Sequence, residues 1–240
     1  VDDALARIAR HDAVLACFAS VRTEAAVQEA RDLKRRVAEG AAQLPLAGVP
    51  IAVKDEVPIS GEVMRAGSRA TDRAPQTSDH PVVARLRDAG AIVVGATTMP
   101  EGALWLTSDG ERVTRNPWQP ERSASGSSGG SAAAVGAGLL PLAHGTDALG
   151  AIRQPAAACG VLGLKPSRGL IPAELGLNDW YGLAENGPMA TTVADLALML
   201  SVMADQPRLA EVRPLRGSLR IAVSSKPPVQ GVRTNPAITA

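Results

Sequence analysis

A serine- and glycine-rich segment is the first candidate for chemistry in this sequence. It reads Gly-Ser-Ser-Gly-Gly-Ser over residues 126–131 and runs directly into an alanine-rich helical pattern at 132–138. Such a loop at a helix amino terminus offers unpaired backbone N–H groups that can bind an anion or a developing negative charge. A flexible linker, a phosphate-binding loop and a catalytic loop are all compatible with these residues alone. The loop has no lysine placed as in a P-loop, which weakens the phosphate interpretation.

A second glycine-bearing turn follows and narrows the choice. It covers residues 145–155 (Gly-Thr-Asp-Ala-Leu-Gly-Ala-Ile-Arg-Gln-Pro) and places Ala151 24 positions after Ser127. In combination with the strand end at 53–55 and the segment 159–166, it resembles the amidase-signature family closely. The segment 187–195 is similar to the family's pattern downstream of the signature, so the resemblance extends from about Leu5 to Val223.

The resemblance implies a Ser–cis-Ser–Lys triad. Lys54 matches the lysine, Ser127 matches the serine that follows a cis peptide bond, and Ala151 stands at the position of the nucleophile. A serine hydroxyl attacks a carbonyl well only if a base takes its proton, and a lysine can be that base only when it is neutral. The apolar run 49–53 predicts burial of Lys54, which would lower its pKa, and Ser127 would relay the proton.

The resemblance also assigns the surrounding positions. Backbone N–H groups of the turn, from Ala148, Leu149, Gly150 and Ala151 itself, would bind the oxyanion, and they act through the main chain whatever the side chain. The polar residues that would brace the site are Ser128, Asp147 and Arg153, and we interpret the last two as a buried hydrogen-bonded pair.

Two departures from the family pattern matter for function. Alanine has no group that can attack an amide, so we expect this chain not to form an acyl-enzyme. An engineered serine replacement, a natural pseudoenzyme and a different nucleophile, Ser127, are the three explanations; the retained Lys54 and glycines favour the first. The second departure is length, because the family's domain is roughly twice as long, and a truncated chain would explain this.

The function implied is hydrolysis of the C–N bond of a linear carboxamide through an acyl-serine intermediate, with a small-molecule amide as substrate and no cofactor or metal. One alternative is the A subunit of a glutamine-dependent tRNA amidotransferase, which shares the signature and works with partner subunits. A second alternative is a non-catalytic amide-binding pseudoenzyme. A homodimer is possible, and the sequence leaves the oligomeric state open.

Composition excludes several other classes of function. Among 240 residues, 25 Lys and Arg balance 24 Asp and Glu, for a net charge of +1. This balance predicts neither nucleic-acid binding nor attraction to an anionic membrane. No apolar run approaches the roughly 20 residues of a membrane helix, and no signal peptide is visible, so we expect a cytoplasmic protein.

The elements that must position these residues can be read from periodicity. Leu5, Ile8, Leu15 and Phe18 recur at helical spacing, and a charged helix is expected at 24–39. Buried strands are predicted at 48–55 and 91–95, and further strands at 141–144 and 219–223. Helices are predicted at about 81–90, 132–138, 151–158 and 193–203. We expect Asp79 to cap the helix that begins near Pro81, and Thr192 to open a capping box.

Strand, loop, helix and strand in this order predict an α/β fold. We expect a mixed, parallel-rich open sheet covered by helices, forming one domain over 1–240 with its core signature at about 48–200 and an incomplete C-terminal side. Cys17 and Cys159 are interpreted as core residues, and the scattered histidines do not suggest a metal site. Met99 and Glu101 match a family segment whose backbone lies near the pocket. Trp105, Trp180 and Tyr181 are candidates either for the wall of the pocket or for the hydrophobic core.

Overall fold

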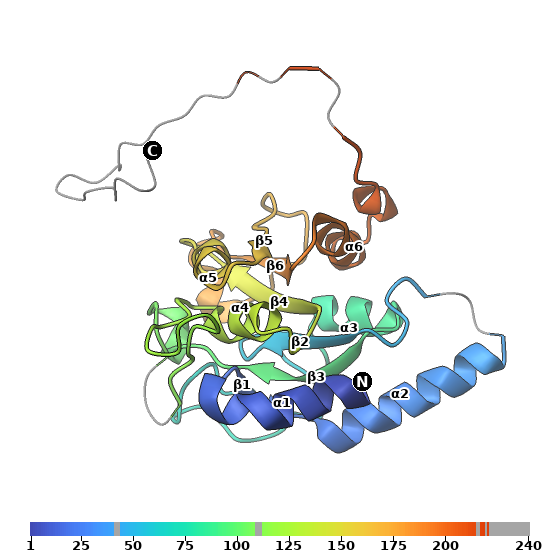
Figure 1. Cartoon of the computed structure of the whole chain (residues 1–240), viewed down its shortest axis with the longest axis horizontal. Helices are drawn as coiled ribbons and strands as arrows, with labels where there is room; N and C mark the ends of the chain where they lie inside the picture. The colour runs from blue at the N-terminus through green and yellow to red at the C-terminus, as the bar shows by residue number, and fades with distance from the viewer. Residues whose placement is uncertain (41–43, 109–111, 215–216, 219, 221–240) are drawn as a thin grey trace.

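A six-stranded sheet forms the centre of the molecule. The computed structural model describes residues 1–40, 44–108, 112–214, 217–218 and 220. The strands lie in the order β1-β3-β2-β4-β6-β5 (Figure 1). Their bounds are β1 (Phe18–Val21), β2 (Pro50–Lys54), β3 (Ile92–Thr97), β4 (Leu142–Asp147), β5 (Leu162–Gly163) and β6 (Glu185–Ala190).

The middle of this sheet is parallel and its margins are antiparallel. Strand β2 runs parallel to both β3 and β4, whereas β1 pairs with β3, and β6 with β4 and β5, in antiparallel fashion. This is the mixed open sheet, with parallel strands flanked by helices, that the sequence predicted. Parallel neighbours end at the same edge of the sheet, so the residues that follow β2 and β4 meet there.

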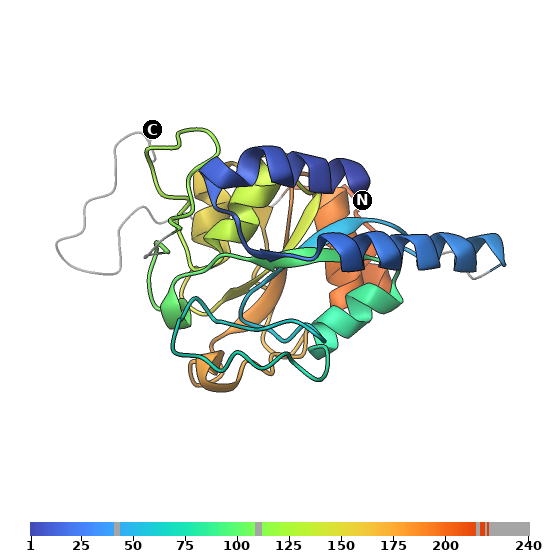
Figure 2. The same ribbon diagram turned by 90° about the horizontal axis from the view of Figure 1, so that it is seen from below.

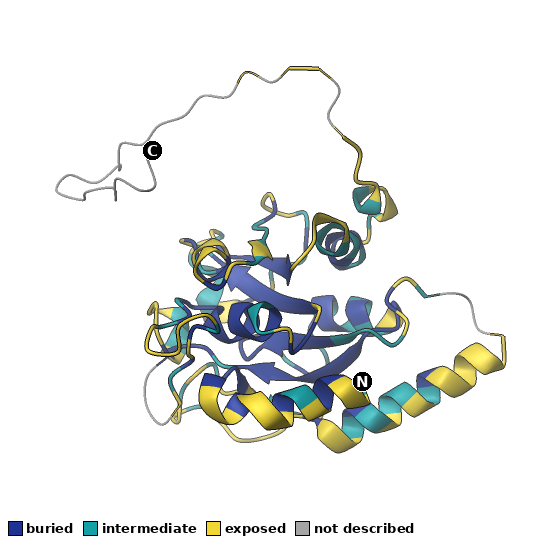
Figure 3. Cartoon of the chain, in the orientation of Figure 1, coloured by how far each residue is buried: buried dark blue, intermediate teal, exposed yellow. Residues whose placement is uncertain are grey.

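Helices cover both faces of the sheet. The helices are α1 (Asp2–Leu15), α2 (Thr23–Ala38), α3 (Pro81–Asp88), α4 (Gly129–Gly136), α5 (Arg153–Cys159) and α6 (Val193–Met203). In Figure 2, α1 and α4 lie on one side of the sheet and α3 lies on the other. Strands β2, β3, β4 and β6 are almost entirely buried, whereas β1, β5 and much of α2 have exposed residues (Figure 3).

Alternation along the strands divides the core into two clusters. On β2, Ile51 and Val53 belong to the cluster shared with α3 and α6, while Ala52 between them belongs to the cluster shared with α1 and α4. On β3, Val93 faces the first cluster and its neighbours face the second. A strand with helices on both sides needs apolar residues at every position, and this explains the continuous apolar runs in the sequence.

The helix beginnings are partly as predicted. Thr192 caps α6, because its hydroxyl oxygen accepts the backbone N–H of Asp195 at 3.1 Å. The prediction that Asp79 caps α3 is wrong: the cap is His80, whose Nδ1 accepts the N–H of Val82 at 3.2 Å. The Asp79 carboxylate is already engaged by the N–H of Ser60 at 2.7 Å.

Other elements differ from the sequence-based expectation. Phe18 does not continue the first helix, because Ala16 adopts a left-handed conformation with φ 52° and the chain turns into β1. Strand β4 extends beyond the predicted 141–144 to Asp147, and β5 and β6 were not predicted as strands. The strand expected at 219–223 lies outside the described residues.

Candidate active site

The candidate site lies where the parallel strands β2 and β4 end beside the start of α4. Lys54 is the last residue of β2, and Thr146 and Asp147 close β4. Ser127 lies just before Ser128, the N-cap residue of α4. The crevice outside the carboxyl ends of parallel strands is where open α/β sheets bind ligands. The topology therefore brings together three segments far apart in the sequence.

The amine of Lys54 is enclosed by three oxygen atoms. Its Nζ lies 2.7 Å from the hydroxyl oxygen of Ser127, 2.5 Å from that of Thr146 and 2.9 Å from Oε2 of Glu56. Thr146 in turn donates its hydroxyl to the same Glu56 oxygen. Lys54 has no exposed surface, and Glu56 and Ser127 are also buried. Lys54 and Ser127 therefore lie within proton-transfer distance of each other.

Burial and charge act in opposite directions on these groups. Burial lowers the pKa of Lys54 from its usual value and outweighs the opposing effect of the Glu56 charge. For Glu56, burial alone would raise the pKa, but the Lys54 charge and the Thr146 hydroxyl hold it below its usual value. The lowered pKa of Lys54 favours the neutral amine that a general base requires.

The serine loop docks against the second turn through its backbone. The Gly126–Ser127 peptide bond is cis. The N–H of Ser128 donates to the carbonyl of Ala151 at 3.0 Å, and the Ser128 hydroxyl donates to the carbonyl of Thr146 at 3.1 Å. Ser128 thus fixes the loop to the end of β4.

The turn that carries position 151 is organised around the Asp147 carboxylate. This buried group accepts the N–H groups of Gly150 at 2.6 Å, Ile152 at 3.2 Å and Arg153 at 3.3 Å. The Arg153 guanidinium donates two hydrogen bonds to the same carboxylate, from Nε at 2.8 Å and from Nη2 at 3.0 Å. Although burial alone would raise the pKa of Asp147, these hydrogen bonds lower it below its usual value. Asp147 and Arg153 are hydrogen-bonded to each other, but the prediction of a buried pair is wrong for Arg153, whose side chain is exposed.

Of the four backbone N–H groups predicted to bind an oxyanion, one is already hydrogen-bonded within the turn. The Gly150 N–H points into the Asp147 carboxylate and is not free for a ligand. In the described part of the chain, the backbone N–H groups of Ala148, Leu149 and Ala151 make no hydrogen bond. The geometry therefore removes Gly150 from the predicted donor set and leaves the other three.

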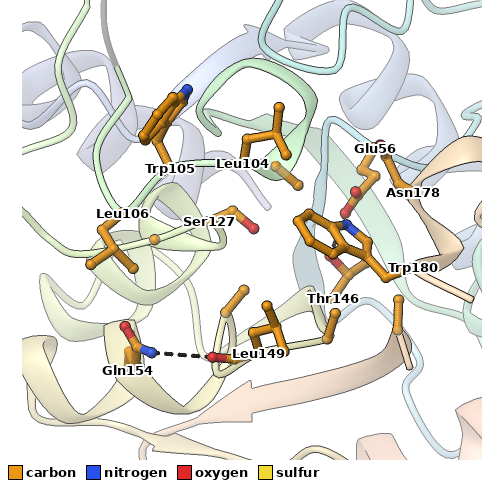
Figure 4. Close-up of a pocket in the computed structure, with 15 residues that line it drawn as sticks. Glu56, Leu104, Trp105, Leu106, Ser127, Thr146, Leu149, Gln154, Asn178 and Trp180 are labelled. Atoms are coloured by element: carbon orange, nitrogen blue, oxygen red, sulfur yellow. Dashed lines mark hydrogen bonds between the residues drawn. The ribbon is translucent and has the colours of Figure 1, made fainter. Parts of the chain in front are cut away.

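A cavity of about 190 Å³ opens in front of these residues. In Figure 4 the Ser127 hydroxyl points into the space between Leu104, Leu149 and Trp180, with Glu56 and Thr146 at its far side. Trp105 and Trp180 line the cavity, whereas Tyr181 lies outside its lining and is fully exposed. The full lining is Glu56, Ala103, Leu104, Trp105, Leu106, Gly126, Ser127, Thr146, Ala148, Leu149, Ala151, Gln154, Asn178, Trp180 and Ala184.

The neighbouring segment 99–106 lies beside the cavity and contributes four lining residues. The side chains of Met99 and Glu101 do not line the cavity: Met99 is buried, and the Glu101 carboxylate accepts the Ser68 hydroxyl at 2.6 Å. The residues that do line it follow them, from Ala103 to Leu106. The segment thus lies beside the cavity, and its lining side chains come from residues 103–106.

Glu56, Thr146 and His144 are site residues that sequence reasoning missed. His144 accepts the backbone N–H of Lys54 at Nδ1 (3.3 Å), and its Nε2 lies 2.8 Å from Oδ1 of Asn186. Burial lowers the pKa of His144 to about 4, so the ring is neutral and holds the end of β2 in place. The sequence could have indicated Glu56 and Thr146 as site residues, because each is a polar residue within two positions of the end of a predicted strand.

No cluster of three or more His, Cys, Asp or Glu side chains suited to a metal occurs among the described residues. Both cysteines are buried and free, and burial raises the pKa of the Cys159 thiol to about 12. Over the same residues, no helix has the length and apolar character of a membrane span.

The fold and the site together define an α/β protein with a buried lysine–serine pair at a glycine-rich turn. Comparison with known proteins identifies the family. The pattern of the Amidase family matches residues 1–232. The chain belongs to the Amidase family.

Individual relatives support this assignment. AmiB2 of Mycobacterium bovis, which is named as a putative amidase, is 45% identical over 231 residues, covering 93% of this chain and 50% of the relative. The A subunit of the glutamyl-tRNA(Gln) amidotransferase of Symbiobacterium thermophilum is 40% identical over 235 residues, covering 97% and 48%. The chain therefore spans about half the length of the curated relatives it matches.

Solved structures share the fold. The crystal structure of an amidase superposes with a TM-score of 0.81 at 36% identity, over 90% of this chain and 49% of that one. The peptide amidase of Stenotrophomonas maltophilia gives 0.74 at 35% identity, over 89% and 46%. An inhibitor-bound complex described with the origins of an s-triazine catabolic enzyme gives 0.80 at 39% identity, over 84% and 45%.

Proposed function

We propose that the chain carries the catalytic frame of an amidase that cleaves a carboxamide C–N bond through an acyl-serine intermediate, with the nucleophile replaced at Ala151. The observation that carries this proposal is the 2.7 Å contact between Lys54 Nζ and the Ser127 hydroxyl, beside the turn that holds position 151. Membership of the Amidase family supports the same reaction class. With alanine at 151, the chain itself would not form the acyl-enzyme.

The reaction would use these groups in sequence when serine occupies position 151. Its hydroxyl oxygen attacks the amide carbonyl carbon, its proton passes to Ser127, and Ser127 gives its own proton to neutral Lys54. The negative charge that forms on the carbonyl oxygen is stabilised by the free backbone N–H groups of the 148–151 turn. Collapse of the tetrahedral intermediate breaks the C–N bond, and the leaving amine takes up the proton. Water then hydrolyses the ester by the same relay.

The cavity favours an uncharged acyl group. Glu56 is the single charged side chain in the lining formed by described residues, and it is paired with Lys54. Trp105, Trp180 and three leucines are the large apolar side chains of the wall. A charged acyl group would lose hydration here without gaining a partner, which is costly in an apolar site. We therefore propose neutral, apolar or aromatic carboxamides as substrates.

Restoring the serine tests the function directly. We expect Ala151→Ser to react with a fluorophosphonate probe, in which the serine oxygen attacks phosphorus and fluoride leaves, and to release ammonia or amine from a panel of neutral amides. The unchanged chain and the double variant Ala151→Ser/Lys54→Met should do neither. A folded Ala151→Ser protein that neither labels nor hydrolyses would refute the proposed reaction.

A second candidate is the A subunit of a tRNA-dependent amidotransferase, because its counterpart in Symbiobacterium thermophilum is 40% identical over nearly the whole chain. That function predicts glutamine as the preferred amide and an activity that depends on partner subunits. The same Ala151→Ser protein separates the two: hydrolysis of neutral amides well above that of glutamine favours the amidase. A strong preference for glutamine favours the amidotransferase.

A further inference from the structure

Glu56 is a buried carboxylate in the candidate active site that the proposed relay does not use. It follows Lys54 by two residues, is only 6% exposed and lines the cavity. Its Oε2 accepts from two groups, the Lys54 amine at 2.9 Å and the Thr146 hydroxyl. A carboxylate is costly to bury unless it is paired, so this pairing requires an explanation.

The directions of the hydrogen bonds restrict what the Lys54 amine can do. Because Thr146 donates its only hydroxyl proton to Glu56, its oxygen can only accept from Lys54. The ionised Glu56 oxygen also accepts only. A neutral amine has two N–H donors and one lone pair, and Glu56 and Thr146 take both donors. The lone pair is then left for the third neighbour, the Ser127 hydroxyl at 2.7 Å.

We propose that Glu56 is a positioning residue that aims the lone pair of Lys54 at Ser127 and balances the positive charge that Lys54 gains on taking the serine proton. This inference rests on the proposed amidase reaction for its purpose, but the pairing itself can be measured without any activity. An ammonium that is fully buried needs a negative partner, and Glu56 supplies it at contact distance.

Other charged groups near Lys54 are less suited to this task. Asp147 also favours the charged lysine, but its carboxylate is neutralised by Arg153. The His144 ring accepts the Lys54 backbone N–H and is neutral. Asp55 points toward the N–H of Arg65 at 3.1 Å. Among the described residues, Glu56 is the carboxylate in contact with the Lys54 amine.

The test follows the titration of Lys54 by NMR. The chain has four lysines, Lys34, Lys54, Lys165 and Lys226, so the ε-¹³C signals of labelled lysine are few. The Lys54 signal is the one missing from Lys54→Met. In Glu56→Gln, which keeps an oxygen acceptor but removes the charge, we expect the Lys54 midpoint to fall by about one to three pH units. Glu101→Gln, an exposed matched control, should leave it unchanged.

Either of two measurements decides whether the Glu56 charge acts on Lys54. If Glu56 served only as a hydrogen-bonded spacer, Glu56→Gln would leave the Lys54 midpoint where it is, and an unchanged or raised midpoint overturns the proposal. If Glu56→Gln does not fold, the Glu56 carboxyl ¹³C signal of the unchanged chain takes its place. We expect it to be ionised at pH 7 and to titrate below the usual range; a protonated Glu56 at pH 7 overturns the proposal. Neither measurement depends on whether Ala151→Ser restores hydrolysis.

Discussion

Replacing Asp147 by asparagine probes the group that organises the turn around position 151. Both carboxylate oxygens accept hydrogen bonds: Oδ1 from Gly150 and Arg153, and Oδ2 from Ile152 and Arg153. An asparagine turns one of these oxygens into an NH₂ group. Whichever way the amide lies, a donor then faces a backbone N–H that has lost its partner.

The expected loss of stability can be worked from these contacts. One or two buried backbone donors lose their acceptor, at about 1–3 kcal/mol each, and the charge that pairs with Arg153 disappears. The Arg153 side chain is 55% exposed, so the ion pair itself adds only about 1 kcal/mol. We expect Asp147→Asn to lower the free energy of unfolding by about 2–7 kcal/mol. Arg153→Gln should cost about 1 kcal/mol.

Urea unfolding followed by circular dichroism measures both changes, provided that the slope m is the same in all variants. The double variant isolates the Asp147–Arg153 coupling from the loss of the backbone acceptors. Equal losses for Asp147→Asn and Arg153→Gln would show that the ion pair, and not the backbone hydrogen bonds, holds the turn. That result would refute the organising role of the Asp147 carboxylate.

Three further changes test other parts of the structure. Burial raises the pKa of Asp55 to about 6, so ionisation of this carboxyl group opposes folding. Relative to Asp55→Asn, the parent should lose up to about 3 kcal/mol of its free energy of unfolding as the pH rises from 4 to 6. Urea unfolding at each pH measures this loss. Gly130→Ala would place a methyl carbon 2.5 and 2.6 Å from two backbone carbonyl oxygens, and should lower the free energy of unfolding by about 2–3 kcal/mol. The control Gly129→Ala should be tolerated, because the nearest atom to its methyl carbon would lie 3.6 Å away. Thermal or urea unfolding measures both variants. Thr192→Ala removes the α6 cap and should cost about 1 kcal/mol, and no loss in the same assay would contradict the capping role.

Local patterns in the sequence were enough to predict most of the helices and the central strands. The continuous apolar run before Lys54 predicted a buried strand and a buried lysine, and both are present. Periodicity failed where a single residue changes the direction of the chain. Leu15 and Phe18 have helical spacing, but Ala16 between them is left-handed, and Phe18 pairs with β3 instead.

The contacts of Glu56 and Thr146 could not be predicted in the same way. They depend on β2 and β4 being parallel neighbours, a pairing of segments 90 residues apart in the chain. The sequence placed each residue near a strand end but contained no information on the register between the strands. The choice of His80 over Asp79 as helix cap has the same origin, because Ser60, 19 residues away, engages Asp79.

The frame around position 151 is independent of the side chain that stands there. The Ala151 carbonyl accepts from Ser128, and the turn on either side is held by the Asp147 carboxylate through backbone N–H groups. None of these contacts uses a side-chain atom of residue 151. A serine at this position would add one hydroxyl facing a cavity and would disturb no hydrogen bond, so we expect Ala151→Ser to unfold within about 0.5 kcal/mol of the parent. The proposed catalytic role of position 151 and the stability of its turn are therefore separable, because the turn is held by the main chain and the Asp147 carboxylate.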